Sequence, residues 1–180
     1  MSEDLSTSVL TPTLLRDAMS QFATGIVVLT VGGQYIHGMT ANAFSSVSLE
    51  PPLVLCCVDR NAVMHEALSS AQRFAVSIMG ADQEDIARYF ADKNRPQGAA
   101  QFDPVDWLPG PHTQAPLLSN ALAWLECELH ESHSSGDHSI FIGSVLNCMR
   151  GRNQRGLLFF DSGYHQVAPI GAAGPDVPMR

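Results

Sequence analysis

Apolar residues recur along this chain with two periods, and the two periods separate predicted strands from predicted helices. Runs of β-branched and apolar residues, such as IVVLTV at 26–31 and LVLCCVD at 53–59, are bounded by Gly, Pro, Asn and Asp, as strands usually are. The segment ALAWLECELHES alternates instead, with Cys127 on one face and Glu126 on the other, which predicts a half-buried strand. The predicted strands occupy residues 23–44 as a hairpin, 53–59, 74–79, 121–132, 138–149 and 157–167.

Short helices are predicted between some of these strands. In the first of them, Pro12 stands at the first helical position, and apolar residues follow at helical spacing. Residues 92–116 are rich in Pro, Gly, Asn and Asp, so we predict a long surface loop there, and SHSSGD at 132–137 is predicted to be a turn. The predicted helices span residues 11–22, 61–70 and 81–91, with Thr11, Asn61 and Asp82 as N-caps.

The connections between the strands indicate the fold class. Six or seven strands joined mostly by turns favour a closed antiparallel barrel, because a doubly wound parallel sheet needs a helix between nearly every strand pair. We expect one domain over residues 11–167, a disordered segment over 1–10 and a flexible tail over 168–180.

Composition narrows the possible partners and the compartment. With 180 residues and a net charge of −8, the chain fits one domain whose surface is unsuited to phosphate backbones, so we expect no nucleic-acid partner. Residues 18–49 carry no Asp, Glu, Lys or Arg, but Gly, Gln and Asn interrupt them too often for a membrane span. The four cysteines show no CxxC spacing, and the N-terminus does not resemble a secretory signal, so we expect a cytoplasmic location.

One uncharged stretch, TANAFSSVS at 40–48, offers several groups that could bind a ligand. Its backbone N–H groups, its hydroxyls and Asn42 can hydrogen-bond carbonyls, ring nitrogens or a phosphate. Arg60 lies beside Asn61 at a predicted helix start, where an anion could meet both a guanidinium and helix N–H groups. The same composition also fits an edge strand with solvated hydroxyls and an Arg60 that pairs with Asp59.

Other chemistry has less support. His130, His133 and His138 surround the predicted turn with Asp137 adjacent, a spacing that zinc could use, but a hydrogen-bonding His138 beside the Gly136 turn is the better use of these residues. The sequence has no GxSxG element, no GxGxxG after a strand and no P-loop. Neither a nucleophilic hydrolase nor a Rossmann or P-loop nucleotide site is therefore indicated.

Several blocks together resemble the flavin reductase family. They are FATGIVVLT, HGMTANAFSSVSLEPPLVLCCVDR, FAVSIM, PLLSNALAWLEC and GDHSIFIGSV, and the likeness runs from about Phe22 to Val167. The resemblance implies a mainly β fold, a six-stranded antiparallel Greek-key split β-barrel of the FMN-binding type with short peripheral helices. It also implies a homodimer with flavin near the subunit interface. The implied reaction is reduction of FMN or FAD by NADH, with NADPH possible, to supply a flavin-dependent monooxygenase.

The resemblance also assigns residues to parts of the ligands. Thr40, Ala41 and Asn42 would face the isoalloxazine ring, Ser45 and Ser46 the ribityl-phosphate region with Val47 beside them, and Asp59, Arg60 and Asn61 the phosphate. His138, within the Gly136-Asp137-His138 block, would meet the nicotinamide and is the candidate catalytic residue. Phe90 and Tyr164 would flank the dinucleotide.

Three functions remain open at this point. The leading one is a flavin reductase in which hydride passes directly from nicotinamide to flavin, so the protein supplies orientation rather than a nucleophile. The second is a split-barrel protein that holds FMN tightly for electron transfer or storage, without nicotinamide turnover. The third is a metal-dependent hydrolase that uses the His cluster.

Overall fold

The computed structural model describes residues 9–152 and 155–167, which form mainly strands joined by turns. The strands are β1 (Thr24–Gly25), β2 (Val27–Val31), β3 (His37–Ala41), β4 (Phe44–Leu49), β5 (Pro52–Asp59), β6 (Arg73–Ile78), β7 (Trp107–Pro109), β8 (Pro116–Leu118), β9 (Ala123–Ser135), β10 (His138–Arg150), β11 (Leu157–Phe160) and β12 (Gly163–Gln166). The helices are α1 (Pro12–Ser20), α2 (Val63–Ala71) and α3 (Glu84–Ala91), with 3-10 turns η1 (Gly33–Tyr35), η2 (Ala81–Gln83) and η3 (Gly98–Phe102).

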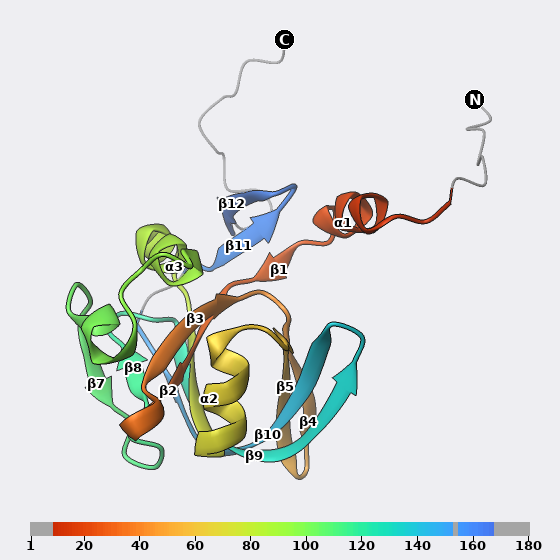
Figure 1. The fold of residues 1–180 in the computed structure, drawn as a ribbon. Helices are drawn as coiled ribbons and strands as arrows, with labels where there is room; N and C mark the ends of the chain where they lie inside the picture. The colour runs from red at the N-terminus through yellow and green to blue at the C-terminus, as the bar shows by residue number, and fades with distance from the viewer. Residues whose placement is uncertain (1–8, 153–154, 168–180) are drawn as a thin grey trace.

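One antiparallel sheet of seven strands, in the order β3-β2-β6-β9-β10-β5-β4, dominates the fold. The sheet curves around α2, which lies between β2 and β3 on one side and β5 and β10 on the other (Figure 1). The predicted mainly β antiparallel class is confirmed. The sheet has one strand more than the six expected, because the hydroxyl-rich residues of β4 pair with β5 although their composition is a weak strand signal.

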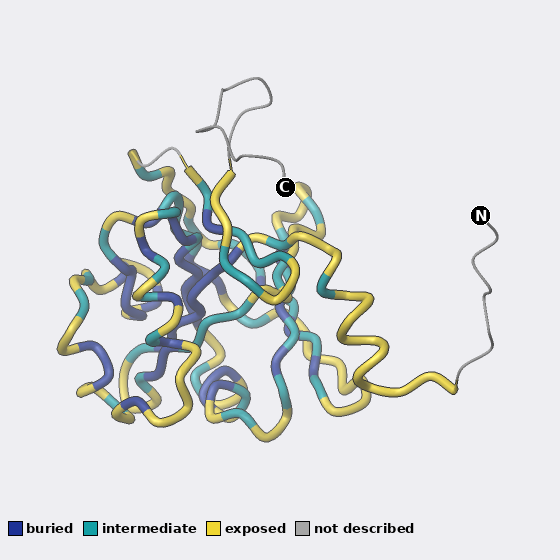
Figure 2. Tube along the Cα trace, turned by 90° about the horizontal axis from the view of Figure 1, so that it is seen from above, coloured by how far each residue is buried: buried dark blue, intermediate teal, exposed yellow. Residues whose placement is uncertain are grey.

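Strand β2 is buried at every position because packing covers both of its faces. Leu29 lies in a cluster with Met64 and Leu68 of α2, whereas Val28 lies in a second cluster with Phe90 of α3. Figure 2 shows the buried positions gathered in the body of the molecule. Helices α2 and α3 therefore pack against opposite faces of β2, and both also contact β3, the strand that follows it.

The first helix has the predicted cap but no buried face. The N–H of Leu14 donates to the Thr11 hydroxyl at 3.2 Å, which confirms Thr11 as N-cap. No residue of α1 is buried, and Figure 2 shows the helix exposed along its length. An amphipathic helix with an exposed apolar face is stable in proteins when another surface covers that face.

The caps predicted for the other two helices were wrong. Helix α2 is preceded by Ala62, and no side chain caps it. The Asp59 carboxylate instead accepts a hydrogen bond from the N–H of Asn61 at 2.8 Å, so the chain stays in a turn through Asn61. Asp82 lies within η2, and α3 begins at Glu84.

Residues 92–116, predicted as a surface loop, are partly buried and contain η3 and β7. Phe102 is 2 % exposed and packs against Phe90 and Trp107, with ring centroids 5.4 and 5.8 Å apart. Gln101 is fully buried beside it. The prediction failed because Pro and Gly indicate local turns but do not say whether the segment packs onto the core.

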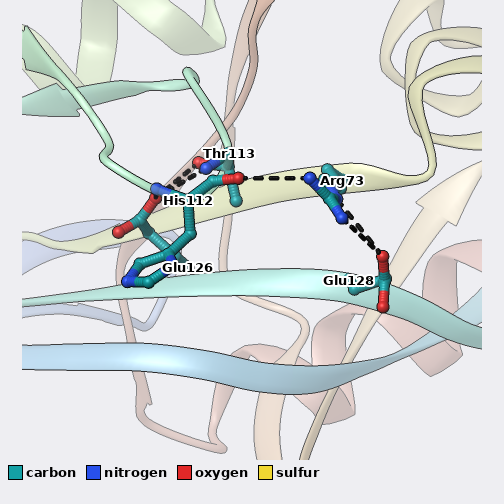
Figure 3. A network of polar contacts seen from close by, with 5 residues as sticks. All are labelled: Arg73, His112, Thr113, Glu126 and Glu128. Carbon is teal, nitrogen blue, oxygen red and sulfur yellow. Dashed lines mark hydrogen bonds and ion pairs between the residues drawn. The ribbon is translucent and has the colours of Figure 1, made fainter.

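Glu126 was expected on the polar face of its strand, but the structure buries it to 1 % exposure. Its Oε2 accepts hydrogen bonds from the N–H of His112 at 2.9 Å, and from the N–H and the hydroxyl of Thr113 at 2.8 and 2.9 Å. Figure 3 shows this carboxylate near the ion pair between Arg73 and Glu128. Burial alone would raise the pKa of Glu126, but these hydrogen bonds hold it below its ordinary value. A charged carboxylate thus fastens the turn between β7 and β8 to β9.

Two strand boundaries also differ from the predictions. Residues 157–167 form a hairpin, β11 and β12, whose turn places Asp161 and Ser162 at φ 46° and 60°. Strand β9 continues to Ser135, so the turn before β10 is much tighter than SHSSGD. Gly136 occupies it at φ 64°, a conformation that glycine adopts without strain.

The predicted disordered segment 1–10 and flexible tail 168–180 lie outside the described residues, except for residues 9 and 10, which are exposed. Across 9–152 and 155–167, no helix is long and apolar enough to cross a membrane.

Candidate functional site

A cavity of about 340 Å³ lies at the start of α2. We call it the α2 cavity. Thr40 of β3 and Asp59 of β5 line one side, and Lys93 and Arg95, which follow α3, line another. At its base are Asn61, Ala62 and Val63, the residues that lead into α2.

The α2 end of this cavity is suited to an anion. Among the described residues, no side chain caps the N-terminal N–H groups of α2. Uncapped N–H groups and the helix dipole attract a phosphate or carboxylate. Lys93 and Arg95 also line this cavity and add positive charge to it.

A second and larger cavity, of about 690 Å³, lies below α1. We call it the α1 cavity. Met19 and Phe22 line it from the N-terminal segment, and Phe159 lines it from β11. Asn42 and Ser45 supply polar groups, while Phe44, Leu55 and Cys57 complete a mostly apolar wall.

Neighbouring positions at the end of β3 and at the end of β5 line the two cavities. Thr40 lines the α2 cavity and Asn42 the α1 cavity, two residues apart along the chain. In the same way, Asp59 lines the first cavity and Cys57 the second. The Thr40 hydroxyl donates to the carbonyl of Ala87 at 2.6 Å, which ties the chain at this point to α3. The predicted ligand stretch at 40–42 therefore leads from a cationic cavity to an apolar one.

The turn between β9 and β10 lies next to the end of β5. His138 pairs in register with Asp59, and the N–H of Arg60 donates to the carbonyl of Asp137 at 3.0 Å. His138 Nδ1 lies 2.8 Å from the Asp137 carboxylate, and the hydrogen bond from His138 lowers the pKa of Asp137. The fold thus brings together two motif blocks, residues 59–61 and 136–138, that are far apart in the sequence.

The other predicted residues lie on three different elements. Phe90 is fully buried in the core, so it contributes to the wall of the α2 cavity but offers no free ring face to flank a dinucleotide. Tyr164 lies on β12 and receives the Arg88 guanidinium on its ring at 4.5 Å. Ser46 and Val47 are exposed on β4, beside a register shift between Ser46 and Ser48.

The histidines near the turn form no metal centre in the described part of the chain, where no group of three or more His, Cys, Asp or Glu could hold a metal ion. His133 Nε2 lies 2.9 Å from Glu131, and His130 Nε2 lies 3.7 Å from the same carboxylate.

Lys93, Arg95 and His37 of the α2 cavity were missed by the sequence analysis. The first two lie in the segment interpreted as a surface loop. The signal available was DKNR, two cations directly after a predicted helix.

An antiparallel β-barrel with a cationic cavity at a helix N-terminus, next to an apolar cavity, defines a ligand-binding barrel protein. Residues 19–168 match the model of the flavin reductase like domain. The chain belongs to this family.

Named relatives and solved structures agree with this assignment. The chain is 49 % identical over 155 residues to an NADH-dependent FAD reductase of Streptomyces globisporus, covering 86 % of this chain and 85 % of the relative. It is similar to the structure of the NADH:FAD oxidoreductase SgcE6 of Streptomyces globisporus C-1027, with a TM-score of 0.84, 45 % identity, and coverage of 90 % and 98 %. It is also similar to BorF, the flavin reductase component of a bacterial two-component tryptophan halogenase, with a TM-score of 0.84, 43 % identity, and coverage of 87 % and 98 %.

Proposed function

We infer that this protein reduces free FMN or FAD with NADH and supplies the reduced flavin to a monooxygenase. The observation that carries the inference is the paired arrangement of the α2 and α1 cavities along residues 40–42 and 57–59, in a chain of the flavin reductase family. A flavin has a phosphate at one end and a large apolar ring at the other, which matches the two cavities.

The chain's own groups orient the reactants. The N-terminus of α2 and Asn61 would hold the phosphate of the flavin, and Thr40–Asn42 would hold its ring toward the α1 cavity. When bound, the flavin accepts hydride from the nicotinamide at its N5 atom. Direct hydride transfer needs reacting atoms held about 3 to 3.5 Å apart but no nucleophile.

His138 serves the nicotinamide end in this proposal. It is half-exposed at the start of β10, next to Asp59 in register, and Asp137 holds its Nδ1. This leaves Nε2 to meet the carboxamide or a phosphate of the dinucleotide, while Gly136 lets the turn approach closely. NADH is preferred over NADPH in the proposal, in line with the NADH-dependent relative.

We further propose a homodimer whose interface includes α1. In the described chain this helix buries none of its residues, and its apolar side chains Leu14, Leu15 and Met19, with Phe22 beyond it, are 45 to 65 % exposed. Because Met19 and Phe22 also line the α1 cavity, a second copy that covers them would close the ring end of the flavin site. All four cysteines are free, which supports a reducing cytoplasmic location.

Steady-state kinetics test the function. Purified protein is mixed with NADH or NADPH, with FMN, FAD or no flavin, and NADH oxidation is followed by absorbance. We expect oxidation that depends on added flavin and is faster with NADH. A protein that remains yellow through dialysis and does not oxidise NADH would instead be a flavin storage or electron-transfer protein.

A further inference from the structure

Arg95 is a buried cation that pairs with no carboxylate in the part of the chain that the structure describes. The residue is 8 % exposed. Its Nη1 donates to the carbonyl of Asp92 at 2.5 Å and its Nη2 donates to the carbonyl of Gly38, while its buried Nε has no hydrogen-bond partner among the described residues. A buried cation is costly unless an anion compensates it, and burial lowers the pKa of Arg95 more than the nearby Tyr89 and Asp92 raise it.

His37 contacts this guanidinium, and Gln101 fixes the backbone that accepts its hydrogen bond. His37 Nε2 lies 3.3 Å from Arg95 Nη2, and His37 Nδ1 lies 3.4 Å from the amide nitrogen of Gln101. Burial and the neighbouring Arg95 lower the pKa of His37 to about 4, so its ring is neutral at pH 7. Gln101 accepts a hydrogen bond from the N–H of Gly38 and donates to the carbonyl of Gly98, both at 2.8 Å. The backbone that receives Arg95 is therefore fixed as well.

The cavity that Arg95 lines has a surplus of positive charge. Arg95 and Lys93 line it together with the uncapped N-terminus of α2. Asp59 is the one carboxylate among its described lining residues, and it already accepts a hydrogen bond from the N–H of Asn61. A phosphate dianion would supply the missing negative charge, whereas a neutral hydroxyl would leave Arg95 buried and unpaired.

We propose that Arg95, held by His37 and Gln101, is a specificity-determining residue that makes the enzyme select flavins with a 5′-phosphate over riboflavin. FMN and FAD carry this phosphate, and riboflavin ends in a hydroxyl there. The proposal rests on the proposed function. It places the decisive charge on Arg95 rather than on Arg60, which is exposed and does not line the cavity.

The test compares kcat/KM for FMN and riboflavin, at fixed NADH, in the natural protein, in Arg95→Gln and in a control. The control is Arg73→Gln, which removes an exposed cation that pairs with Glu128 outside the site. We expect the natural protein to prefer FMN about 10- to 100-fold, the factor that corresponds to charge-assisted hydrogen bonds. Arg95→Gln should remove most of this preference by lowering kcat/KM for FMN while riboflavin changes less than about threefold. Arg73→Gln should keep the preference.

The outcomes separate the possible failures. Equal losses for FMN and riboflavin in Arg95→Gln would mean that Arg95 supports the fold rather than the choice of flavin, and would overturn the proposal. If Arg95→Gln does not fold, the natural protein alone still tests the proposal. Equal kcat/KM values for riboflavin and FMN would overturn it without any variant. Gln101→Leu, which loosens the support of Arg95, should reduce the preference in part. Oxidation of NADH with no flavin at all would instead refute the proposed function.

Discussion

Replacing Glu126 by Gln should destabilise the protein far more than the same change at its exposed neighbour Glu128. The Glu126 carboxylate is buried and accepts three hydrogen bonds on Oε2 from His112 and Thr113, and a fourth on Oε1 from Asn147 at 3.3 Å. In Glu126→Gln, three bonds to a charged acceptor become bonds to a neutral one, a loss of about 1 kcal/mol each. The new amide NH₂ also faces the NH₂ of Asn147, so two donors meet.

The expected loss is about 3 to 4 kcal/mol in the free energy of unfolding at pH 7, measured by urea denaturation. For a chain of this size, that corresponds to a fall in Tm of about 6 to 16 °C. Glu128→Gln is the matched control. Glu128 forms an exposed ion pair with Arg73 at 3.0 Å, so its replacement should cost under about 1 kcal/mol.

The effect of Glu126→Gln should also depend on pH. Since hydrogen bonds lower the native pKa of Glu126 below the ordinary value of 4.5, its charge stabilises the fold fully above that value. The contribution disappears as the pH falls through the lowered native pKa, so the difference between the two proteins should shrink in acid. A difference below about 1 kcal/mol at pH 7, or one that does not change with pH, would refute the reasoning.

Three further changes have defined expectations. Gly38→Ala would place a Cβ 2.6 Å from a buried aromatic ring of α3, so it should cost about 1 to 3 kcal/mol of stability and weaken flavin binding, both measurable by thermal shift. His138→Ala should raise KM for NADH more than KM for flavin, and equal increases would contradict its place at the nicotinamide end. Burial raises the pKa of Cys56 and of Cys127 to about 12, whereas Cys148 is exposed, so a thiol reagent at pH 8 should label Cys148 in the native protein before the two buried thiols.

The strands of the barrel were predictable because their signal is local. β2, β5 and β6 are compact apolar runs with turn residues at their ends, and their positions follow from these runs alone. The N-cap Thr11 was predictable for the same reason, since a cap acts within one turn of its helix. The stretch at 40–42 was predicted to bind a ligand because it is rich in hydrogen-bonding groups and lacks charge, and Thr40 and Asn42 line the two cavities in the structure.

The errors lie where a residue's state depends on a distant segment. Glu126 falls on the polar face of its alternating strand, which predicts an exposed position. In the structure, the turn between β7 and β8 covers it, and backbone N–H groups of this turn donate the hydrogen bonds that offset the cost of burying its charge. Phe90 is a large apolar residue on a helix, and only the packing of Phe102 against it shows that it belongs to the core. No local pattern reports such contacts.

The family and the mainly β antiparallel fold could be predicted from the sequence alone, because they depend on short-range periodicity and on motifs contiguous in the chain. Only the tertiary structure decided which charges reach the site. Arg60, beside the motif, is exposed, whereas Arg95 is carried into the α2 cavity by contacts to Gly38 and His37, 57 and 58 residues earlier. Burial removes the water around a charged group, so the energy of that group depends on the protein groups that it contacts. Which groups are buried depends on the packed fold rather than on any one segment.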